Sequence, residues 1–210
     1  MLLHRTRLHR RSLLALAAAG LALPLHARAQ DARMSPRALG NPKAPVSVME
    51  FFSLTCTHCA AFANETFPDV KSKLVDTGKL YYVFRDFPLD QVALTAAMVA
   101  RSLPADRYEP FILALFHSQD RWAFARDVNT TDELAKMAAL AGMPRDTFNT
   151  TIADTKLRNA ILAEQDAAEK KYGIDSTPTF IFNGPKAHDM KQAGEMGYDA
   201  FDALVKQAGG

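Results

Sequence analysis

Three stretches of the chain have the apolar, β-branched and aromatic character of buried strands. Residues 45–52 and residues 80–84 are rich in valine, phenylalanine or tyrosine, which favours extended structure. Residues 174–182 form the third stretch, with Pro178 close to its start, where the loss of one ladder donor is tolerated. Two strands are therefore expected early in the chain and one near its end.

A helix is expected between the first two strands. Its apolar face recurs at spacings of four, three and four residues, through Ala63, Phe67, Val70 and Leu74. Gly78 follows where a glycine C-cap would end the helix. The chain therefore passes from strand to helix in the short stretch around residue 56.

Helical spacing of apolar residues dominates from about residue 90 to residue 172. Pro104 interrupts this stretch and Gly173 ends it, as proline and glycine commonly do in helices. No glycine-rich linker separates it from the strands on either side. The pattern predicts an α/β fold in which residues 39–89 and 173–210 form one core and residues 90–172 an inserted helical domain.

The first 29 residues are expected to be a cleaved signal peptide. An arginine-rich start precedes an apolar run over residues 13–25, which is too short to span a bilayer as a stable helix. Ala27-Arg28-Ala29 is a small-x-small cleavage signal, so the mature chain would begin at Gln30. The pair Arg10-Arg11 also resembles a twin-arginine signal. General secretory and twin-arginine export both stay open, and an uncleaved membrane anchor is the alternative.

The charge of the mature chain differs from that of the whole sequence. The net charge of the full chain is +2, but the leader holds five arginines and no acidic residue. Without the leader, 20 basic and 23 acidic residues remain, a net charge near −3. This balance argues against nucleic acid or an anionic membrane surface as a partner.

Residues 30–38 are expected to form a polar, flexible lead-in to the core.

Cys56 and Cys59 are the only cysteines of the sequence, and Cys56 stands where strand gives way to helix. Unpaired backbone N–H groups and the helix dipole stabilise an anion there, so the pKa of Cys56 should be lowered. A redox-active pair is the favoured interpretation. A structural disulfide would close too short a loop to stabilise the fold much, and a zinc site would need two further ligands.

The segment Val48–Ser53 and the motif Cys56-Thr57-His58-Cys59 resemble the active-site segment of DsbA-like thiol:disulfide oxidoreductases, a family of the thioredoxin superfamily. Thr57 stands where that family usually has proline. Residues 39–45 also resemble the family's lead into its first core strand, and the resemblance extends over residues 39–208. It implies a thioredoxin-like core with an inserted α-helical domain.

The resemblance implies a role for each residue of the motif. Cys56 would be the exposed nucleophile and Cys59 the buried resolving cysteine, with exchange passing through a mixed disulfide. His58 would add a hydrogen-bond donor and a positive charge beside Cys56; the alternative is a polar residue of the helix start. Glu50 would be a buried acid that exchanges a proton with Cys59; the alternative is a glutamate on an exposed strand face.

Thr177-Pro178 matches the cis-proline loop of the same family. The resemblance implies that this loop faces the cysteine pair and that the backbone at Thr177 pairs with a substrate peptide, as in strand addition. The alternative is an ordinary proline at the start of a strand.

The expected function is that of a periplasmic thiol:disulfide oxidoreductase that donates its disulfide to reduced, newly exported proteins. It would act as a monomer without cofactor or metal, and a DsbB-like membrane protein would reoxidise it or a reducing partner would reduce it. A reductase or isomerase is the alternative enzyme, although residues 30–38 are too short for the dimerisation domain that isomerases usually carry. A metal-binding module or metal chaperone that uses the cysteine pair is the alternative of another class.

Overall fold

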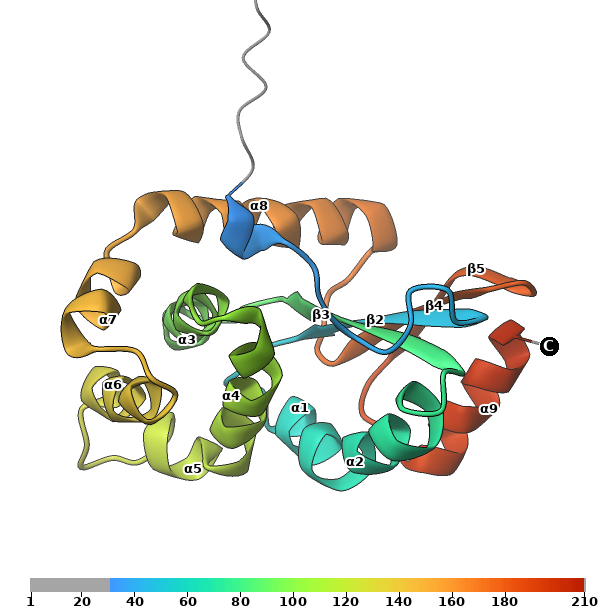
Figure 1. Cartoon of the computed structure of the whole chain (residues 1–210), viewed down its shortest axis with the longest axis horizontal. Coiled ribbons are helices and arrows are strands. Elements are labelled where there is room, and N and C mark those ends of the chain that lie inside the picture. Colours follow the sequence, from blue (N-terminus) through green and yellow to red (C-terminus); the bar gives the residue numbers. More distant parts are fainter. Residues whose placement is uncertain (1–30, 210) are drawn as a thin grey trace, which may run out of the picture. The chain divides into compact units, whose positions relative to one another are not determined.

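One mixed sheet organises the part of the chain that the structure describes. The structure is a computed structural model and describes residues 31–209. Five strands occur in these residues, in the order β1–β3–β2–β4–β5 (Figure 1). They are β1 Arg37–Leu39, β2 Val46–Phe52, β3 Leu80–Asp86, β4 Thr179–Gly184 and β5 Ala187–Ala193. β2 and β3 are parallel, and the other neighbouring pairs are antiparallel.

Helices connect β2 to β3 and β3 to β4, and one further helix follows β5. From β2 to β3 the chain is helical as α1 Thr57–Ala61, a π-helical turn Phe62–Thr66, α2 Phe67–Val70 and a second π-helical turn Lys71–Val75. From β3 to β4 it forms α3 Gln91–Ser102, α4 Ala105–His117, α5 Gln119–Trp122, α6 Thr130–Leu140, α7 Arg145–Ile152 and α8 Thr155–Tyr172. The last helix, α9 Tyr198–Gly209, follows β5. The helical segment α3–α8 therefore lies within the crossover in which the sequence pattern predicted it.

Both faces of the central strand β2 are covered, which explains its nearly continuous apolar run. Val48 and Phe52 belong to the main core, which α1, α2 and α9 cover on one side of the sheet (Figure 1). Phe51 faces the other side, where it packs with Ala168 of α8. Because side chains alternate along a strand, Glu50 lies on the same face as Val48 and Phe52. A carboxylate is thereby placed in the main core, on the side of the sheet that carries α1.

A buried ion pair joins the sheet to the helical segment. Arg101 of α3 is 1% exposed, and its Nε donates a hydrogen bond to Asp86 at the end of β3. The hydroxyl of Tyr108 in α4 also donates to Asp86, at 3.1 Å. A guanidinium nitrogen of Arg101 reaches the carbonyl oxygen of Ser35, at 3.1 Å. Strand β3, two helices and the N-terminal segment therefore meet around one carboxylate.

The prediction that residues 30–38 form a flexible lead-in is wrong for the part of that segment within the described residues. Ala32–Met34 is a short 3₁₀ helix, and β1 begins at Arg37 and pairs with β3. Met34 is buried in a cluster with Leu94 and Leu157, which anchors the segment to α3 and α8. One buried methionine in a polar stretch carries too little pattern for this docking to be predicted.

The signal peptide predicted for residues 1–29 lies outside the described residues, as does the expected start of the mature chain at Gln30. Within residues 31–209 no helix combines the length and the apolar character needed to cross a membrane.

Replacing Arg101 with Met should destabilise the fold strongly, because it leaves the buried carboxylate of Asp86 without its cation. Breaking a buried pair in this way costs about 3–5 kcal/mol of unfolding free energy. Urea unfolding of the variant and of the wild type would measure the difference.

The matched control is Lys206→Met, which removes the exposed cation of the surface pair between Lys206 and Asp202. This variant should unfold close to the wild-type midpoint, because exposed ion pairs contribute little. If Arg101→Met behaved like the control, the buried pair would not hold the helical segment to the sheet.

Candidate active site

Cys56 lies at the N-terminus of α1, after a turn that ends strand β2. Its N–H donates to the carbonyl oxygen of Ser53, at 3.1 Å, which closes the turn Ser53–Cys56. Its own carbonyl oxygen accepts the first helical hydrogen bond, from Ala60 at 3.1 Å. Cys56 is therefore the N-cap residue of α1, next to the free N–H groups of the first helical turn.

Hydrogen bonds to the sulfur, above all from the Cys59 thiol, lower the pKa of the Cys56 thiol from 9.0 to about 5. The largest contribution is a hydrogen bond from the thiol of Cys59, and the backbone N–H groups of Cys59 and His58 add to it. Partial burial opposes them but does not outweigh them. In its thiol form Cys56 donates to the carbonyl oxygen of Thr177, at 3.3 Å. Cys56 is thus partly exposed and ionised at neutral pH, as a nucleophile must be.

Unlike Cys56, Cys59 is fully buried and its thiol stays protonated at neutral pH. Its side chain is fully buried, and burial raises the pKa of its thiol well above the usual value. The hydrogen bond that it donates to Cys56 and the nearby charge of Glu50 raise that pKa further. One cysteine of the motif is therefore a thiolate and the other a thiol at neutral pH. Such a pair, with pKa values pushed apart, distinguishes an attacking sulfur from a resolving one.

Glu50 is a buried acid, so the alternative of a glutamate on an exposed strand face is wrong. The residue is 4% exposed, and the hydroxyl of Tyr82 donates to its Oε2 at 2.7 Å. Burial raises the pKa of Glu50 from 4.5 to about 7, a negative charge on Cys56 adds to the rise, and the hydrogen bond from Tyr82 opposes it. Its other oxygen, Oε1, has no hydrogen-bond partner among the residues that the structure describes. Glu50 can therefore hold or release a proton near neutral pH.

The imidazole of His58 is exposed and lies beside an acidic side chain. Its side chain is 68% exposed, and Nδ1 lies 3.2 Å from a carboxylate oxygen of Glu195. What His58 contributes to the Cys56 sulfur is its backbone N–H. The Cys59 thiol contributes most to the low pKa of Cys56, and the backbone N–H groups of Cys59 and His58 add to it.

The Thr177–Pro178 peptide bond is cis, and the loop lies beside the cysteine pair, as the resemblance implied. Thr177 is largely buried, and its carbonyl oxygen is the atom that faces Cys56. The alternative of an ordinary proline at the start of a strand is therefore wrong.

Three residues that support the site escape prediction from the sequence. Tyr82 holds Glu50, Glu195 holds the imidazole of His58, and Gln119 contacts the turn that carries Cys56. Tyr82 lies in an apolar strand, where it resembles any other core aromatic residue. Glu195 and Gln119 are distant in sequence from the motif and belong to no pattern that would single them out.

Within residues 31–209 no cluster of three or more histidine, cysteine, aspartate or glutamate side chains is arranged to hold a metal ion.

A family model described as Thioredoxin matches residues 33–207. In the solved structure of α-DsbA1 from Wolbachia pipientis, the chain is 35% identical to this one, with a TM-score of 0.75 over 83% of this chain and 91% of that one. A protein-disulfide isomerase from Novosphingobium aromaticivorans is 25% identical, with a TM-score of 0.69 over 81% and 95% of the two chains. A protein of Rickettsia prowazekii with the provisional name protein-disulfide oxidoreductase is 32% identical over 70% of this chain and 53% of its own length. The chain thus spans little more than half the length of its Rickettsia relatives.

Replacing Glu50 with Gln should stabilise the reduced protein at alkaline pH and change it little at acidic pH. Because the folded-state pKa is raised from 4.5 to about 7, the contribution of Glu50 to stability is fully present below pH 4.5 and lost as the pH rises through 7. Above that range the glutamine variant should gain on the order of 3 kcal/mol relative to the wild type. Urea unfolding from about pH 4 to about pH 9 would measure this gain.

Glu65→Gln is the matched control, since Glu65 is exposed. Its difference from the wild type should stay flat across the same pH range. A flat difference for Glu50→Gln as well would mean that Glu50 titrates alike in the folded and unfolded states.

Proposed function

We propose, because the chain belongs to the DsbA-like family of thiol:disulfide oxidoreductases in the thioredoxin superfamily, that it donates the Cys56–Cys59 disulfide to exported proteins. Its fold class is the predicted one, a thioredoxin-like core with an inserted helical domain.

The observation that carries the proposal is the opposite ionisation of the two thiols. A pKa of about 5 at Cys56 stabilises the reduced protein, because the thiolate exists in the dithiol state and not in the disulfide. A disulfide whose reduced form is stabilised is a good oxidant. The same property makes Cys56 a good leaving group when a client is released. Donation of the disulfide is therefore favoured over reduction of clients.

The proposed reaction begins when a client thiolate attacks the Cys56 sulfur of the Cys56–Cys59 disulfide. That S–S bond breaks, a mixed disulfide forms between the client and Cys56, and Cys59 leaves as a thiolate that takes up a proton. A second client thiolate then attacks the client sulfur of the mixed disulfide and releases Cys56 as a thiolate. The client loses two electrons and gains a disulfide, and the protein ends as the reduced pair.

We assign the proton of Cys59 to Glu50. A thiolate at Cys59 is costly, because the side chain is buried and Glu50 adds a negative charge beside it. A carboxyl group whose pKa lies at about 7 is matched to giving or taking that proton at neutral pH. Tyr82 holds the carboxylate in place through Oε2. Glu50 would thus exchange a proton with Cys59 in both directions of the reaction.

The loop at Thr177 and Pro178 is the proposed site for the client backbone. The carbonyl oxygen of Thr177 lies beside the Cys56 sulfur, where an extended client segment that brings its cysteine to Cys56 would pass. Main-chain pairing of this kind binds many sequences, because it does not depend on client side chains. The side chains of His58 and Glu195 are exposed and accessible to a client.

The leader-like residues 1–29 support export to the periplasm, an oxidising compartment in which a disulfide donor can work. A membrane partner similar to DsbB would reoxidise the cysteine pair there. The mass of the protein recovered from the periplasm tests this proposal, since it should correspond to a chain that begins at Gln30. A full-length chain in the membrane fraction would contradict it.

A disulfide isomerase is the second candidate, because the similar Novosphingobium protein is described as one. An isomerase rearranges the wrong disulfides of a client without net oxidation, and it does so in its reduced form. Reduced protein added to a scrambled client would restore the client's activity only if the protein were an isomerase.

Tight stoichiometric binding of zinc or copper, without exchange activity, would instead indicate a metal-binding module.

Replacing Cys56 with Ala should abolish disulfide donation, and replacing Cys59 with Ala should trap clients as mixed disulfides. The first change removes the attacked sulfur, and the second removes the thiol that would release the client from Cys56. Non-reducing electrophoresis of protein mixed with a disulfide-containing peptide would show the trapped species. Full turnover by Cys59→Ala would contradict the roles assigned to the two cysteines.

Glu50→Gln should slow the step that depends on Cys59 and spare the attack by Cys56. In the reaction of the reduced protein with a disulfide peptide, Cys56 attacks as a preformed thiolate, whereas Cys59 must first lose its proton. Stopped-flow measurement resolves the two steps, and the second should slow by about 10²–10⁴-fold at neutral pH, the usual range for general base catalysis.

Tyr82→Phe is the matched control for the proton exchange, because it removes the hydrogen bond to Glu50 but keeps the carboxyl group. Its second step should slow far less than that of Glu50→Gln. Equal second-step rates in Glu50→Gln and the wild type would show that the carboxyl group does not exchange the proton.

A further inference from the structure

Gln119 connects the helical segment to the backbone of the active-site turn. It is the first residue of α5 and is only 5% exposed. Its side-chain Nε2 donates to the carbonyl oxygen of Leu54, at 2.9 Å, and to that of Cys56, at 3.0 Å. One amide group thus binds both carbonyls that flank Thr55, and one of them belongs to the reactive cysteine itself.

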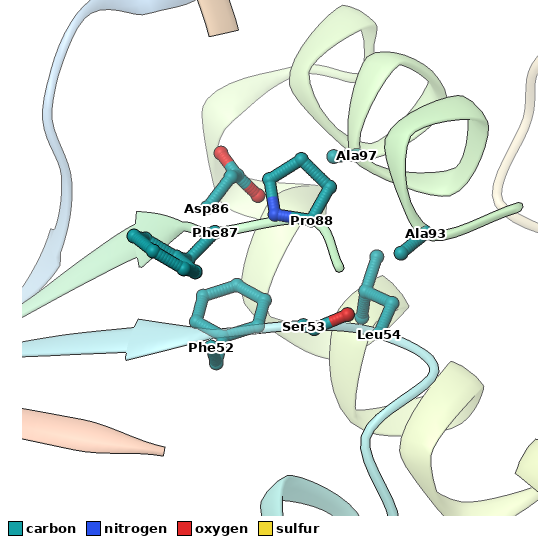
Figure 2. Close-up of a pocket in the computed structure, with 8 residues that line it drawn as sticks. All are labelled: Phe52, Ser53, Leu54, Asp86, Phe87, Pro88, Ala93 and Ala97. Carbon is teal, nitrogen blue, oxygen red and sulfur yellow. The ribbon is translucent and has the colours of Figure 1, made fainter. Parts of the chain in front are cut away.

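Two further contacts from the helical segment reach the same turn. The hydroxyl of Thr55 donates to Asp90, at 2.6 Å, and Asp90 in turn caps α3 by accepting from the N–H of Ala93, at 2.7 Å. Leu54 is buried and lies with Ala93 and Ala97 of α3 around one small pocket (Figure 2). Asp90, the N-cap residue of α3, therefore holds the side chain of Thr55 in this turn. Gln119 of α5 holds the backbone of the same turn.

We propose that Gln119 is a positioning residue for thiol–disulfide exchange: it fixes the backbone of Cys56 so that the N–H groups of His58 and Cys59 face the sulfur. The inference rests on the exchange reaction proposed above. Gln119 does not touch the sulfur and acts through the orientation of the residue that bears it.

The geometry of the N-cap explains why a bond to a carbonyl affects a sulfur. The Cys56 carbonyl already accepts from Ala60, and the second donor from Gln119 fixes the direction of this peptide group from outside the helix. The side chain of Cys56 leaves the same residue toward the N–H groups of the first turn. Without the amide of Gln119, the buried carbonyl of Leu54 loses this donor and the Cys56 carbonyl keeps only the one from Ala60, so the turn must move to reach water or another donor. The N–H to sulfur contacts would then lengthen.

Gln119→Met tests the inference, because methionine has a similar length but no donor. The acid dissociation constant of the Cys56 thiol, measured from thiolate ultraviolet absorbance against pH, should fall by about tenfold, because two hydrogen bonds that order the N-cap are lost. The equilibrium constant with glutathione should shift by a similar factor, toward a less oxidising protein. Gln119→Asn keeps the amide on a shorter side chain, and it should give a smaller shift in the same direction.

The matched control is Gln165→Met in α8, where the glutamine side chain donates only to Glu169 among the described residues. This variant should titrate at Cys56 as the wild type does. A merely structural role of Gln119 would destabilise the oxidised and reduced proteins equally and leave the Cys56 titration unchanged in both Gln119 variants, which would overturn the inference. The Cys56 titration is readable whether or not the protein oxidises clients, so a failure of the proposed function would be seen separately.

Discussion

The free energy of one negative charge, on the sulfur of Cys56, governs the chemistry of this protein. The charge is stabilised by the neighbouring thiol and by the first N–H groups of a helix, and it exists only when the pair is reduced. The second sulfur, one helical turn further on, is buried where a charge is costly. In the proposed exchange reaction, the difference between the two sulfurs would set which of them is attacked, which one resolves the mixed disulfide, and in which direction electrons flow.

The fold supplies this difference through the position of the pair on the edge of the main core. Strand β2 is covered on both faces, and the helix that follows it begins at the exposed residues Thr57 and His58 and is buried at Cys59. Glu50 lies on the same face of the strand and places a titratable group beneath the buried thiol. The helical segment α3–α8 packs around the end of β3 and holds the turn that carries Cys56. Sheet, helix start and insertion thus act on the same few atoms.

The sequence predicts those parts of the structure that repeat a pattern or match a motif. The strands of the core, the helical segment between residues 90 and 172 and the positions of the two cysteines follow from periodicity and spacing. Strand β5 lies at the edge of the sheet and reads Ala-His-Asp-Met-Lys-Gln-Ala, in which apolar and polar residues do not alternate, so its sequence does not reveal a strand. The two π-helical turns lie in the helical stretch between β2 and β3. The apolar spacing of that stretch predicts an ordinary α-helix and does not reveal them. The contacts of Tyr82, Gln119 and Glu195 depend on tertiary packing, which no local pattern encodes.

The equilibrium of the cysteine pair with glutathione tests the central claim most directly. A protein whose reduced form is stabilised by the Cys56 thiolate should be a strong oxidant, with a reduction potential more positive than about −180 mV, the value typical of protein disulfide isomerase. A potential near about −270 mV, the value typical of thioredoxin, would contradict the account, because it would mean that the charge on Cys56 does not favour the reduced state.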